Sequence, residues 1–591
     1  MMQALHPSIA PWLQRSERGL EITLLLRGAD GVRPFVRHLP DNEEELVPLQ
    51  PAGAARTWAT WTVSIPWDGG NEVTRYCFKL LAGDGSQWLA ADGLHTRVPP
   101  EAAHFRVNRV QVPPAWVAEQ VFYQVFPDRF ARGSEGPVTL PPDVPGQASN
   151  EALRWGQPVP LDKPTTVFYG GDLAGLQQKL GYLQQELGIT ALYLNPIFRS
   201  RSNHKYDTES YDEVDPGFGG NQALAALRSA TDQRGMRLVL DAVVNHTGAQ
   251  HPWFNRGGDH PSIGASQSAE SPWRAWYAFD SDGLPRGWKG YDSLPVLDYA
   301  RPEVKAAMYE APDSVMRRWM QPPYAIDGWR LDAVHMLGEG LGARNNAGVM
   351  RQMRQAVKGQ NPEAYLVGEH FNEASAWLQG DQEDGAMNYY GFAHPLRAWL
   401  AGLDLNGHPV TLTTRDFASW LREAMAAVPY ANQLAQLNLL DSHDTPRLLT
   451  LLGEDFDAMR IAATLLFTYP GTPCVYYGDE IGLAGGQDPD CRRCFDWDRS
   501  RWVMPLFDHY RAAIARRHAR PELRHGAFVE LWADGDVYAF ARFTANSATV
   551  VAVNRGSSPA HFAPALTELP GGVHLPSSCE VPARGSFVWS S

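Results

Sequence analysis

Apolar and polar positions alternate near both ends of the chain in a way that is typical of β-strands. At the start, the strand-like runs are 20–26, 57–65 and 74–81. They predict an N-terminal β-sandwich over residues 1–112, which ends at Pro113 and Pro114. At the other end, the strand-like runs are 528–532, 537–543 and 548–553. They predict a small antiparallel β-domain over residues 521–591.

Between residues 113 and 520 the pattern changes to short apolar runs separated by stretches of helical period. The first helix has leucines three and four residues apart, from Leu173 to Leu187, with Asp172 placed to cap it and Gly188 placed to end it. Further helices are predicted at 221–235, 306–320, 457–468 and 505–520. The strand-like runs are 121–126, 191–194, 236–244, 328–331, 365–367, 386–390, 434–440 and 474–477. Eight strands with helices between them predict a (β/α)8 TIM barrel, in which active sites lie at the C-terminal strand ends.

The periodicity fails between residues 246 and 298, where Gly, Pro, Ser, His and Trp are frequent. A loop of this length inside a compact domain is usually functional. It follows the third predicted strand, so it belongs to the end of the barrel where the active site is expected.

Composition and charge restrict the class of protein. The chain has 591 residues, enough for three or four domains, and its net charge of −14 argues against a nucleic-acid partner. No run approaches the roughly 18 apolar residues of a membrane span, and no signal peptide is evident in residues 1–19.

Five cysteines favour a reducing, cytoplasmic setting. Cys491 and Cys494 form a lone CxxC, which we interpret as two free thiols because no second pair follows at zinc spacing.

Three acidic residues follow apolar runs at predicted strand ends: Asp332, Glu369 and Asp444. A carboxylate is costly to bury there unless it is paired or takes part in chemistry. Parallel strands bring their C-terminal ends together, so these carboxylates are expected to converge. Two carboxyl groups that face one bond are what glycoside hydrolysis requires.

We assign the nucleophile to Asp332 and the acid/base to Glu369. Arg330 lies two residues before Asp332, on the same strand face, and can hold it ionised through a charge-assisted hydrogen bond. Glu369 must be protonated to donate to the leaving oxygen, and negative charge on Asp332 and Asp444 favours that form. The alternatives are a buried Arg–Asp pair that serves stability alone, and a surface glutamate after a strand.

The other candidate residues would hold the sugar. Asp444 is expected to bind two hydroxyls and to stabilise positive charge in the transition state, while Asp241 supports Arg330 or contacts substrate. Tyr206 is a candidate platform for a sugar ring, because pyranose C–H faces pack on aromatic rings. Trp288 and Trp497 are weaker candidates, since most of the 20 tryptophans belong in the core. The remaining substrate-binding assignments are His246, His443, His370 and Arg447. Each histidine has a structural role as its alternative.

Four motifs carry a family resemblance. They are Asp-Ala-Val-Val-Asn-His (241–246), Gly-Trp-Arg-Leu-Asp (328–332), Val-Gly-Glu-His (367–370) and Leu-Asp-Ser-His-Asp (440–444). In this order they resemble the signature regions of the α-amylase family, glycoside hydrolase family 13. The runs 121–130 and 168–173 resemble the neopullulanase and cyclomaltodextrinase group. The runs 294–299, 334–339 and 386–389 are similar to the bacterial maltodextrin glucosidase branch.

The resemblance implies a retaining α-glucosidase that hydrolyses α-1,4 linkages of short maltodextrins and releases glucose. The alternative within the class is a neopullulanase or cyclomaltodextrinase-type hydrolase, or a transglycosylase. The alternative of another class is a non-catalytic carbohydrate-binding or scaffold barrel, against which the complete carboxylate set argues. The resemblance gives the residues the roles assigned above, with Arg330, His246, His443 and Tyr206 at the sugar whose bond is cleaved.

The resemblance also implies a domain organisation and partners. It implies a small inserted domain over residues 246–298, and several members form a homodimer in which one N-terminal domain covers the partner's active site. Many relatives carry a calcium loop after the first barrel strand. Here residues 131–136 lack several of the about six to eight oxygen ligands that calcium takes. We expect a maltooligosaccharide substrate, no metal, no cofactor, no nucleic acid and no membrane.

Overall fold

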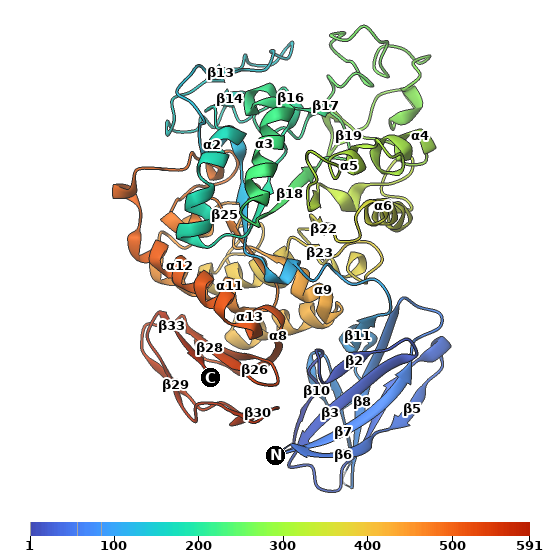
Figure 1. Cartoon of the computed structure of the whole chain (residues 1–591), viewed down its shortest axis with the longest axis vertical. Coiled ribbons are helices and arrows are strands. Elements are labelled where there is room, and N and C mark those ends of the chain that lie inside the picture. Colours follow the sequence, from blue (N-terminus) through green and yellow to red (C-terminus); the bar gives the residue numbers. More distant parts are fainter. Residues whose placement is uncertain (1, 56, 84) are drawn as a thin grey trace.

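The computed structural model describes residues 2–55, 57–83 and 85–591. Its centre is a barrel of eight parallel strands (Figure 1). The strands are β12 (Phe122–Val125), β15 (Ala191–Leu194), β18 (Arg237–Ala242), β21 (Gly328–Leu331), β22 (Tyr365–Gly368), β23 (Gly385–Ala386), β24 (Leu437–Asn438) and β25 (Thr472–Tyr476). Each pairs with the next in chain order, β25 pairs with β12, and a parallel bridge from Met387 to Leu437 joins β23 to β24. The ring is therefore closed, and the predicted TIM barrel is confirmed.

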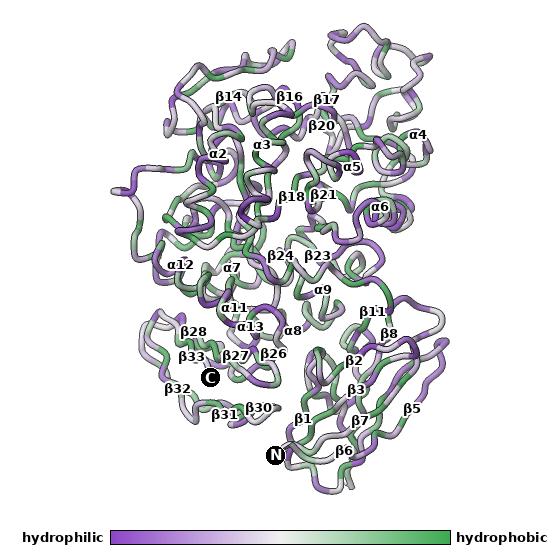
Figure 2. The backbone as a smooth tube through the Cα atoms, viewed as in Figure 1, coloured by the Kyte–Doolittle hydropathy of each residue, from purple (hydrophilic) through white to green (hydrophobic). Residues whose placement is uncertain are grey.

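The barrel strands are continuous apolar runs because both of their faces are covered. Alternate side chains enter two separate cores, since successive residues of a strand point to opposite faces. Phe122, Tyr193, Val239, Tyr365 and Val367 pack inside the barrel. Their strand neighbours pack outward against the helices. Figure 2 shows these strands as hydrophobic stretches and the surrounding connections as more polar.

Helices cover the outside of the barrel. The longer ones are α3 (Gly220–Asp232), α6 (Asn346–Gln360), α8 (Thr414–Ala426), α11 (Phe456–Thr468) and α12 (Met504–Ala519). The helix predicted after Asp172 begins as expected, with the Asp172 carboxylate accepting the Gly175 N–H at 2.6 Å. It is not continuous: α2 (Leu173–Gln178) is followed by a π-helical turn (Tyr182–Leu187), which ends at Gly188 with φ +94°. That left-handed backbone favours glycine, as predicted.

Three sequence predictions of regular structure were wrong in part. The helix predicted at 306–320 is broken after a π-helical turn (Ala306–Glu310), which continues α4 (Pro302–Lys305), and resumes as α5 (Val315–Arg318), because Ala311 precedes Pro312 and is extended. The strand at 386–390 stops at Ala386, since Asn388 caps a helical turn by accepting the Gly391 N–H. The strand at 434–440 is short, since α9 (Tyr430–Ala435) occupies its start.

The N-terminal region folds into two antiparallel sheets that share one core. One sheet contains β3 (Gly19–Arg27) and β7 (Trp58–Pro66), and the other contains β4 (Arg33–His38) and β8 (Val73–Ala82). Alternate residues of β3, such as Ile22 and Leu24, meet Phe78 and Leu80 of β8 in this core. The predicted N-terminal antiparallel sheets are thus confirmed.

The C-terminal region is an antiparallel sheet in the order β26 (Ala527–Asp534), β27 (Val537–Phe543), β28 (Ala548–Asn554) and β33 (Gly585–Ser590). Tyr538 and Phe540 on one face join the core between barrel and helices. Ala539 and Ala541 on the other face pack with Trp58 of the N-terminal sheets. The two β-regions therefore lie together at one end of the molecule, below the barrel in Figure 1.

The irregular segment after β18 is held together by aromatic packing and a short hairpin. Trp253 and Trp276 meet edge to face at 4.7 Å, and β19 (Gly287–Trp288) pairs with β20 (Tyr291–Pro295). An antiparallel bridge between His246 and Val296 returns the segment to its starting point. Within the described residues, no helix is both long and apolar enough to cross a membrane.

Candidate active site

The inward strand positions of the barrel continue into the predicted carboxylates. Tyr365 and Val367 line the barrel interior, so Glu369, two residues later, leaves β22 on the same face. Val239 precedes Asp241 in the same way, and Arg330 precedes Asp332. The period of the strand therefore brings these side chains to the C-terminal mouth of the barrel. This is where a TIM barrel carries its active site.

Arg330 is the centre of the site. Its side chain is fully buried, and Nη1 donates to Asp332 Oδ1 at 2.8 Å and to Asp241 Oδ1 at 3.0 Å. Nη2 lies 3.2 Å from Glu369 Oε2 and 4.0 Å from Asp444 Oδ2. One guanidinium thus contacts or approaches four carboxylates that come from three strand ends and the loop after β24.

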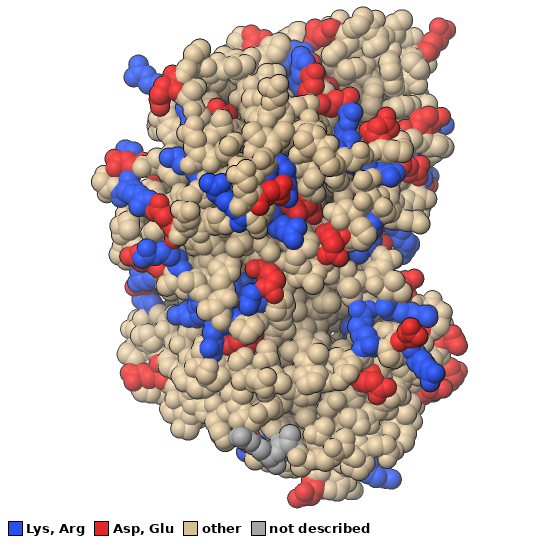
Figure 3. Space-filling view, in the orientation of Figure 1, with Lys and Arg blue, Asp and Glu red and all other residues tan. Residues whose placement is uncertain are grey.

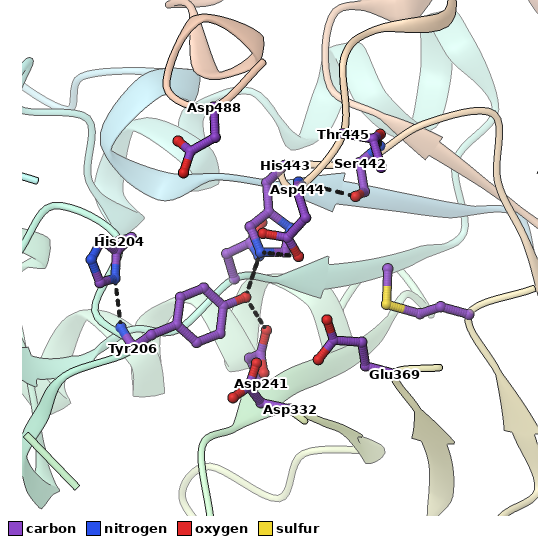
Figure 4. A network of polar contacts seen from close by, with 12 residues as sticks. His204, Tyr206, Asp241, Asp332, Glu369, Ser442, His443, Asp444, Thr445 and Asp488 are labelled. Carbon is purple, nitrogen blue, oxygen red and sulfur yellow. Dashed lines mark hydrogen bonds and ion pairs between the residues drawn. The ribbon is translucent and has the colours of Figure 1, made fainter. Parts of the chain in front are cut away.

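Asp332 accepts a hydrogen bond from Nη1 and Glu369 lies within ion-pair distance of the neighbouring Nη2, so the two carboxyls cannot be far apart. The Ala333 N–H also donates to Glu369 Oε2 at 2.7 Å, which fixes Glu369 against the backbone that follows Asp332. Figure 4 shows the two carboxyl groups side by side, with Asp444 facing them. The Asp332 and Glu369 side chains are each 11% exposed and that of Asp444 is 26% exposed, so all three remain accessible to a ligand.

Burial and mutual repulsion govern the charges of this site. Burial and then the Glu369 charge raise the pKa of Asp332 well above its ordinary value, although Arg330 acts in the opposite direction. Arg330 makes the predicted hydrogen bond to Asp332 and lowers its pKa, but burial and the Glu369 charge together act more strongly in the opposite direction. Burial also raises the pKa of Asp241 to about 6, against the effect of Arg330. The pKa of Arg330 is raised by these anions in spite of its burial.

A chain of hydrogen bonds orients His443 and Tyr206. Gln124 Nε2 donates to His443 Nδ1 at 2.8 Å, which leaves the proton of the neutral ring on Nε2. That nitrogen lies 2.6 Å from the Tyr206 hydroxyl and 3.1 Å from Asp444 Oδ2. The Tyr206 hydroxyl in turn donates to Asp241 Oδ2 at 3.0 Å (Figure 4). Burial lowers the pKa of His443 well below its ordinary value, so the ring is a neutral donor.

His246 lies at the mouth, but its ring nitrogens already have partners. Nε2 contacts the Tyr206 carbonyl oxygen at 3.2 Å, and Nδ1 contacts Asn245 Nδ2 at 3.2 Å. Burial lowers the pKa of His246 to about 4. His246 therefore fixes the Tyr206 loop. The Trp288 ring lies 6.0 Å from that of His246, at the edge of the site.

Three predicted ligand residues are used elsewhere. Arg447 is fully buried, and each of its three side-chain nitrogens donates to an internal partner, Asp479 or the Tyr477 and Cys491 carbonyls, so it does not face the mouth of the site. His370 is 4% exposed, and its Nε2 lies 3.0 Å from both oxygens of Glu383. Trp497 donates to the Phe130 carbonyl and packs on Phe495 at 4.2 Å. Arg447 and Trp497 are therefore not ligands of the sugar. His370 supports the end of β22, next to Glu369.

Sequence reasoning missed two residues that hold the site. Gln124 sets the tautomer of His443, as described above. Arg492 donates from Nε to the His443 carbonyl at 2.8 Å, and its Nη2 lies 3.4 Å from Asp444 Oδ1. Its Nη1 also pairs with Asp488 at 2.9 Å. Gln124 was detectable as a polar residue at an inward strand position. Arg492 lies inside the CxxC segment, and nothing in the sequence connects it with Asp444.

The expectation that the chain binds no metal stays a prediction. Over residues 2–55, 57–83 and 85–591, no group of three or more His, Cys, Asp or Glu side chains could hold a metal ion. In the stretch after β12, Asp172 Oδ1 accepts the N–H groups of Gly133 and Gly175 at 3.0 and 2.6 Å. That carboxylate thus organises the loop through backbone hydrogen bonds.

Comparison with known proteins agrees with this arrangement. Residues 124–520 match the family model for the α-amylase catalytic domain. The chain belongs to the α-amylase family. It is 36% identical over 550 residues to a cyclomaltodextrinase of Geobacillus thermopakistaniensis, covering 90% of this chain and 85% of that protein. It is 35% identical over 465 residues to neopullulanase 2 of Thermoactinomyces vulgaris, covering 77% and 72%.

The similarity in structure extends over the whole molecule. A solved cyclomaltodextrinase superposes with a TM-score of 0.73 at 28% identity, covering 99% of this chain and 98% of that chain. This α-amylase family protein therefore falls in the neopullulanase and cyclomaltodextrinase group, as the runs at 121–130 and 168–173 predicted. The relatives support a glycoside hydrolase that acts on α-glucans. They favour the cyclomaltodextrinase and neopullulanase alternative over the α-glucosidase that was our first expectation.

Proposed function

We propose that this protein is a retaining hydrolase of α-1,4 linkages in cyclic and short linear maltodextrins. The relatives described above are named for cyclomaltodextrin and pullulan substrates, which supports this choice. On the face drawn in Figure 3, Lys and Arg are interspersed with Asp and Glu, a distribution that suits a neutral ligand. The maltodextrin glucosidase activity remains the second candidate, carried by the runs 294–299, 334–339 and 386–389. The homodimer and the cytoplasmic setting stay predictions.

The observation that carries the proposal is the position of Asp332 and Glu369 on one guanidinium. In the first step, an Asp332 oxygen attacks the anomeric carbon while Glu369 gives its proton to the leaving glycosidic oxygen. The C–O bond breaks as the Asp332–glycosyl ester forms. In the second step, Glu369 takes a proton from water, and the resulting oxygen nucleophile displaces Asp332. Two inversions leave the α-configuration unchanged.

Asp444 would act directly on the sugar and His443 indirectly. Asp444 faces the pair, accepts hydrogen bonds from hydroxyls and supplies negative charge near the oxocarbenium-like carbon. His443 is buried, and because Gln124 occupies Nδ1, its Nε2–H is directed at Tyr206 and Asp444, which it holds in place. Tyr206 is half-buried, its hydroxyl is bonded to Asp241 and its ring is stacked 5.5 Å from that of His443, and we expect its exposed part to pack on the sugar. A non-catalytic barrel that only binds carbohydrate is disfavoured, because binding alone does not need the neighbouring carboxyls of Asp332 and Glu369.

Substrate class can be tested directly by product analysis. We expect β-cyclodextrin to be opened with a kcat/KM at least comparable to that of maltoheptaose, and the first products of both to be α-anomers. Time-resolved chromatography and proton NMR measure these two properties. Immediate glucose from maltoheptaose with no opening of cyclodextrin would favour the maltodextrin glucosidase. A β-anomer as first product would overturn the two-step mechanism.

Activity should follow a bell-shaped pH profile. The carboxyls of Asp332 and Glu369 interact, so the active form carries one proton on the pair. In acid the pair holds two protons and Asp332 cannot attack, whereas in alkali no proton is left for the leaving group. Because the pKa of Asp332 is raised from its ordinary value of 3.8, we expect the acidic limb of kcat/KM to lie above about pH 4.

The control is Glu373→Gln. It removes a glutamate charge at an exposed position, four residues after Glu369 and outside the pair of interacting carboxyls. Its pH profile should superpose on that of the wild type. A wild-type rate that stays constant from acid to alkali would contradict the pair.

A further inference from the structure

A second pair of carboxyl groups lies behind the site and takes no part in the proposed reaction. Asp441 follows β24 and Asp479 follows β25, and the two are 2% and 4% exposed. Their side chains are within hydrogen-bonding distance of each other. Arg447 is fully buried beside them and donates from Nη1 to Asp479 Oδ1 at 2.8 Å.

The hydrogen bonds around this pair leave one oxygen without a donor. Asp441 Oδ2 accepts the Leu448 N–H at 2.6 Å, but Asp441 Oδ1 is buried and receives none from the described residues. Two ionised carboxylates could not bond to each other, and Arg447 balances only one of them. A single proton between Asp441 and Asp479 would supply the missing donor and balance the charge.

The pair also closes the loop that carries Asp444. The hydrogen bond from Leu448 to Asp441 joins the two ends of the segment 441–448, and His443 and Asp444 lie between those ends. Arg447 ties the same segment to the loop after β25 through Tyr477 and Cys491. That second loop contains Arg492, which contacts Asp444.

We propose that a proton shared between Asp441 and Asp479 fastens these two loops together, and that Asp441 and Asp479 act as positioning residues for Asp444. The inference rests on the proposed hydrolysis for its activity measurement only.

Other groups face the pair from each packed element. Burial raises the pKa of Glu480, but its oxygens accept hydrogen bonds from Tyr123, Tyr182 and the Gly478 N–H and so have their own donors. Tyr510 of α12 and Cys474 of β25 also face the pair, and burial raises the pKa of each. They are therefore neutral at physiological pH. Among these groups Arg447 is the one cation in contact with the pair, and it contacts Asp479.

The first test uses the isosteric variants Asp441→Asn and Asp479→Asn. In either, the amide NH2 supplies the donor that the shared proton supplies in the wild type. We expect kcat at the optimal pH to stay within about threefold of wild type, since Asp444 keeps its place. Asp441→Ala removes the loop closure, and we expect kcat to fall by about tenfold or more with little change in KM.

The second measurement is thermal unfolding against pH, which needs no substrate. Burial raises the pKa of both carboxyls, so the folded protein binds a proton that the unfolded chain releases above about pH 4. That contribution to stability is present in acid and is lost as pH rises. The Tm of Asp441→Asn should therefore fall less than that of wild type between about pH 5 and about pH 8. The exposed control Asp313→Asn should follow wild type.

Two outcomes would overturn the inference. One is an Asp441→Asn variant as slow as Asp441→Ala, because the amide would then fail to replace the shared proton. The other is a dependence of Tm on pH in Asp441→Asn and Asp479→Asn that runs parallel to that of wild type. This second outcome can be measured even if the alanine variant does not fold. A wild-type protein that cleaves no glucan would refute the proposed function and leave the Tm test intact.

Discussion

Replacing Asp332 by asparagine should lower kcat/KM on maltoheptaose by about 10⁴-fold or more, as removal of a covalent nucleophile does. The amide cannot form the glycosyl ester, and no other carboxylate of the site is placed to replace it, since Asp241 is enclosed by Arg330, Tyr193 and Tyr206. Initial rates by reducing-sugar assay, with mass spectrometry for a trapped glycosyl adduct, provide the measurement. The wild type should show the adduct and the variant should not.

The control for this prediction is Asp313→Asn, which makes the same chemical change at an exposed residue and should leave turnover unaltered. Asp332→Ala should be as inactive as Asp332→Asn, which guards against slow conversion of asparagine back to aspartate. Turnover within tenfold of wild type in both Asp332 variants, with a normal control, would remove Asp332 from the mechanism.

The fold was predictable because buried parallel strands leave a strong pattern. The runs at 191–194 and 328–331 coincide with β15 and β21, since continuous apolar residues with polar ends are typical of a covered strand. β24 was poorly predicted. It has two residues, and the apolar run around it includes the end of α9, so periodicity could not separate helix from strand there.

The core of the site was also predictable, since strand period determines which side chains meet. Asp241, Asp332 and Glu369 were expected near Arg330, and all three lie within ion-pair distance of its guanidinium. Arg447 shows what one sequence does not reveal. A charged residue near a catalytic motif contacts ligand or packs inside, depending on partners distant in the chain, here Asp479 and Cys491. The pKa of Asp332 likewise depends on the tertiary structure, because burial raises it and Arg330 lowers it.

Replacing Glu369 by glutamine should separate substrates by the quality of their leaving groups. Natural maltooligosaccharides need protonation of the departing oxygen, so their kcat/KM should fall by about 10²- to 10⁴-fold, the usual contribution of a general acid. An α-maltoside of 2,4-dinitrophenol departs without a proton, so its first step should be much less affected. Formation of the glycosyl ester from that substrate should remain fast, and its hydrolysis should become slow because no base activates water.

The same variant changes the electrostatics of its neighbour in a defined direction. The Glu369 charge is the second cause of the raised pKa of Asp332, after burial. Removing that charge lowers the pKa of Asp332, so the acidic limb measured with the dinitrophenyl substrate should move to lower pH, and the alkaline limb should disappear. Glu373→Gln should do neither. Equal losses on good and poor leaving groups, with an unmoved acidic limb, would show that Glu369 neither donates the proton nor interacts with Asp332, and the assignment of acid and nucleophile would then have no support.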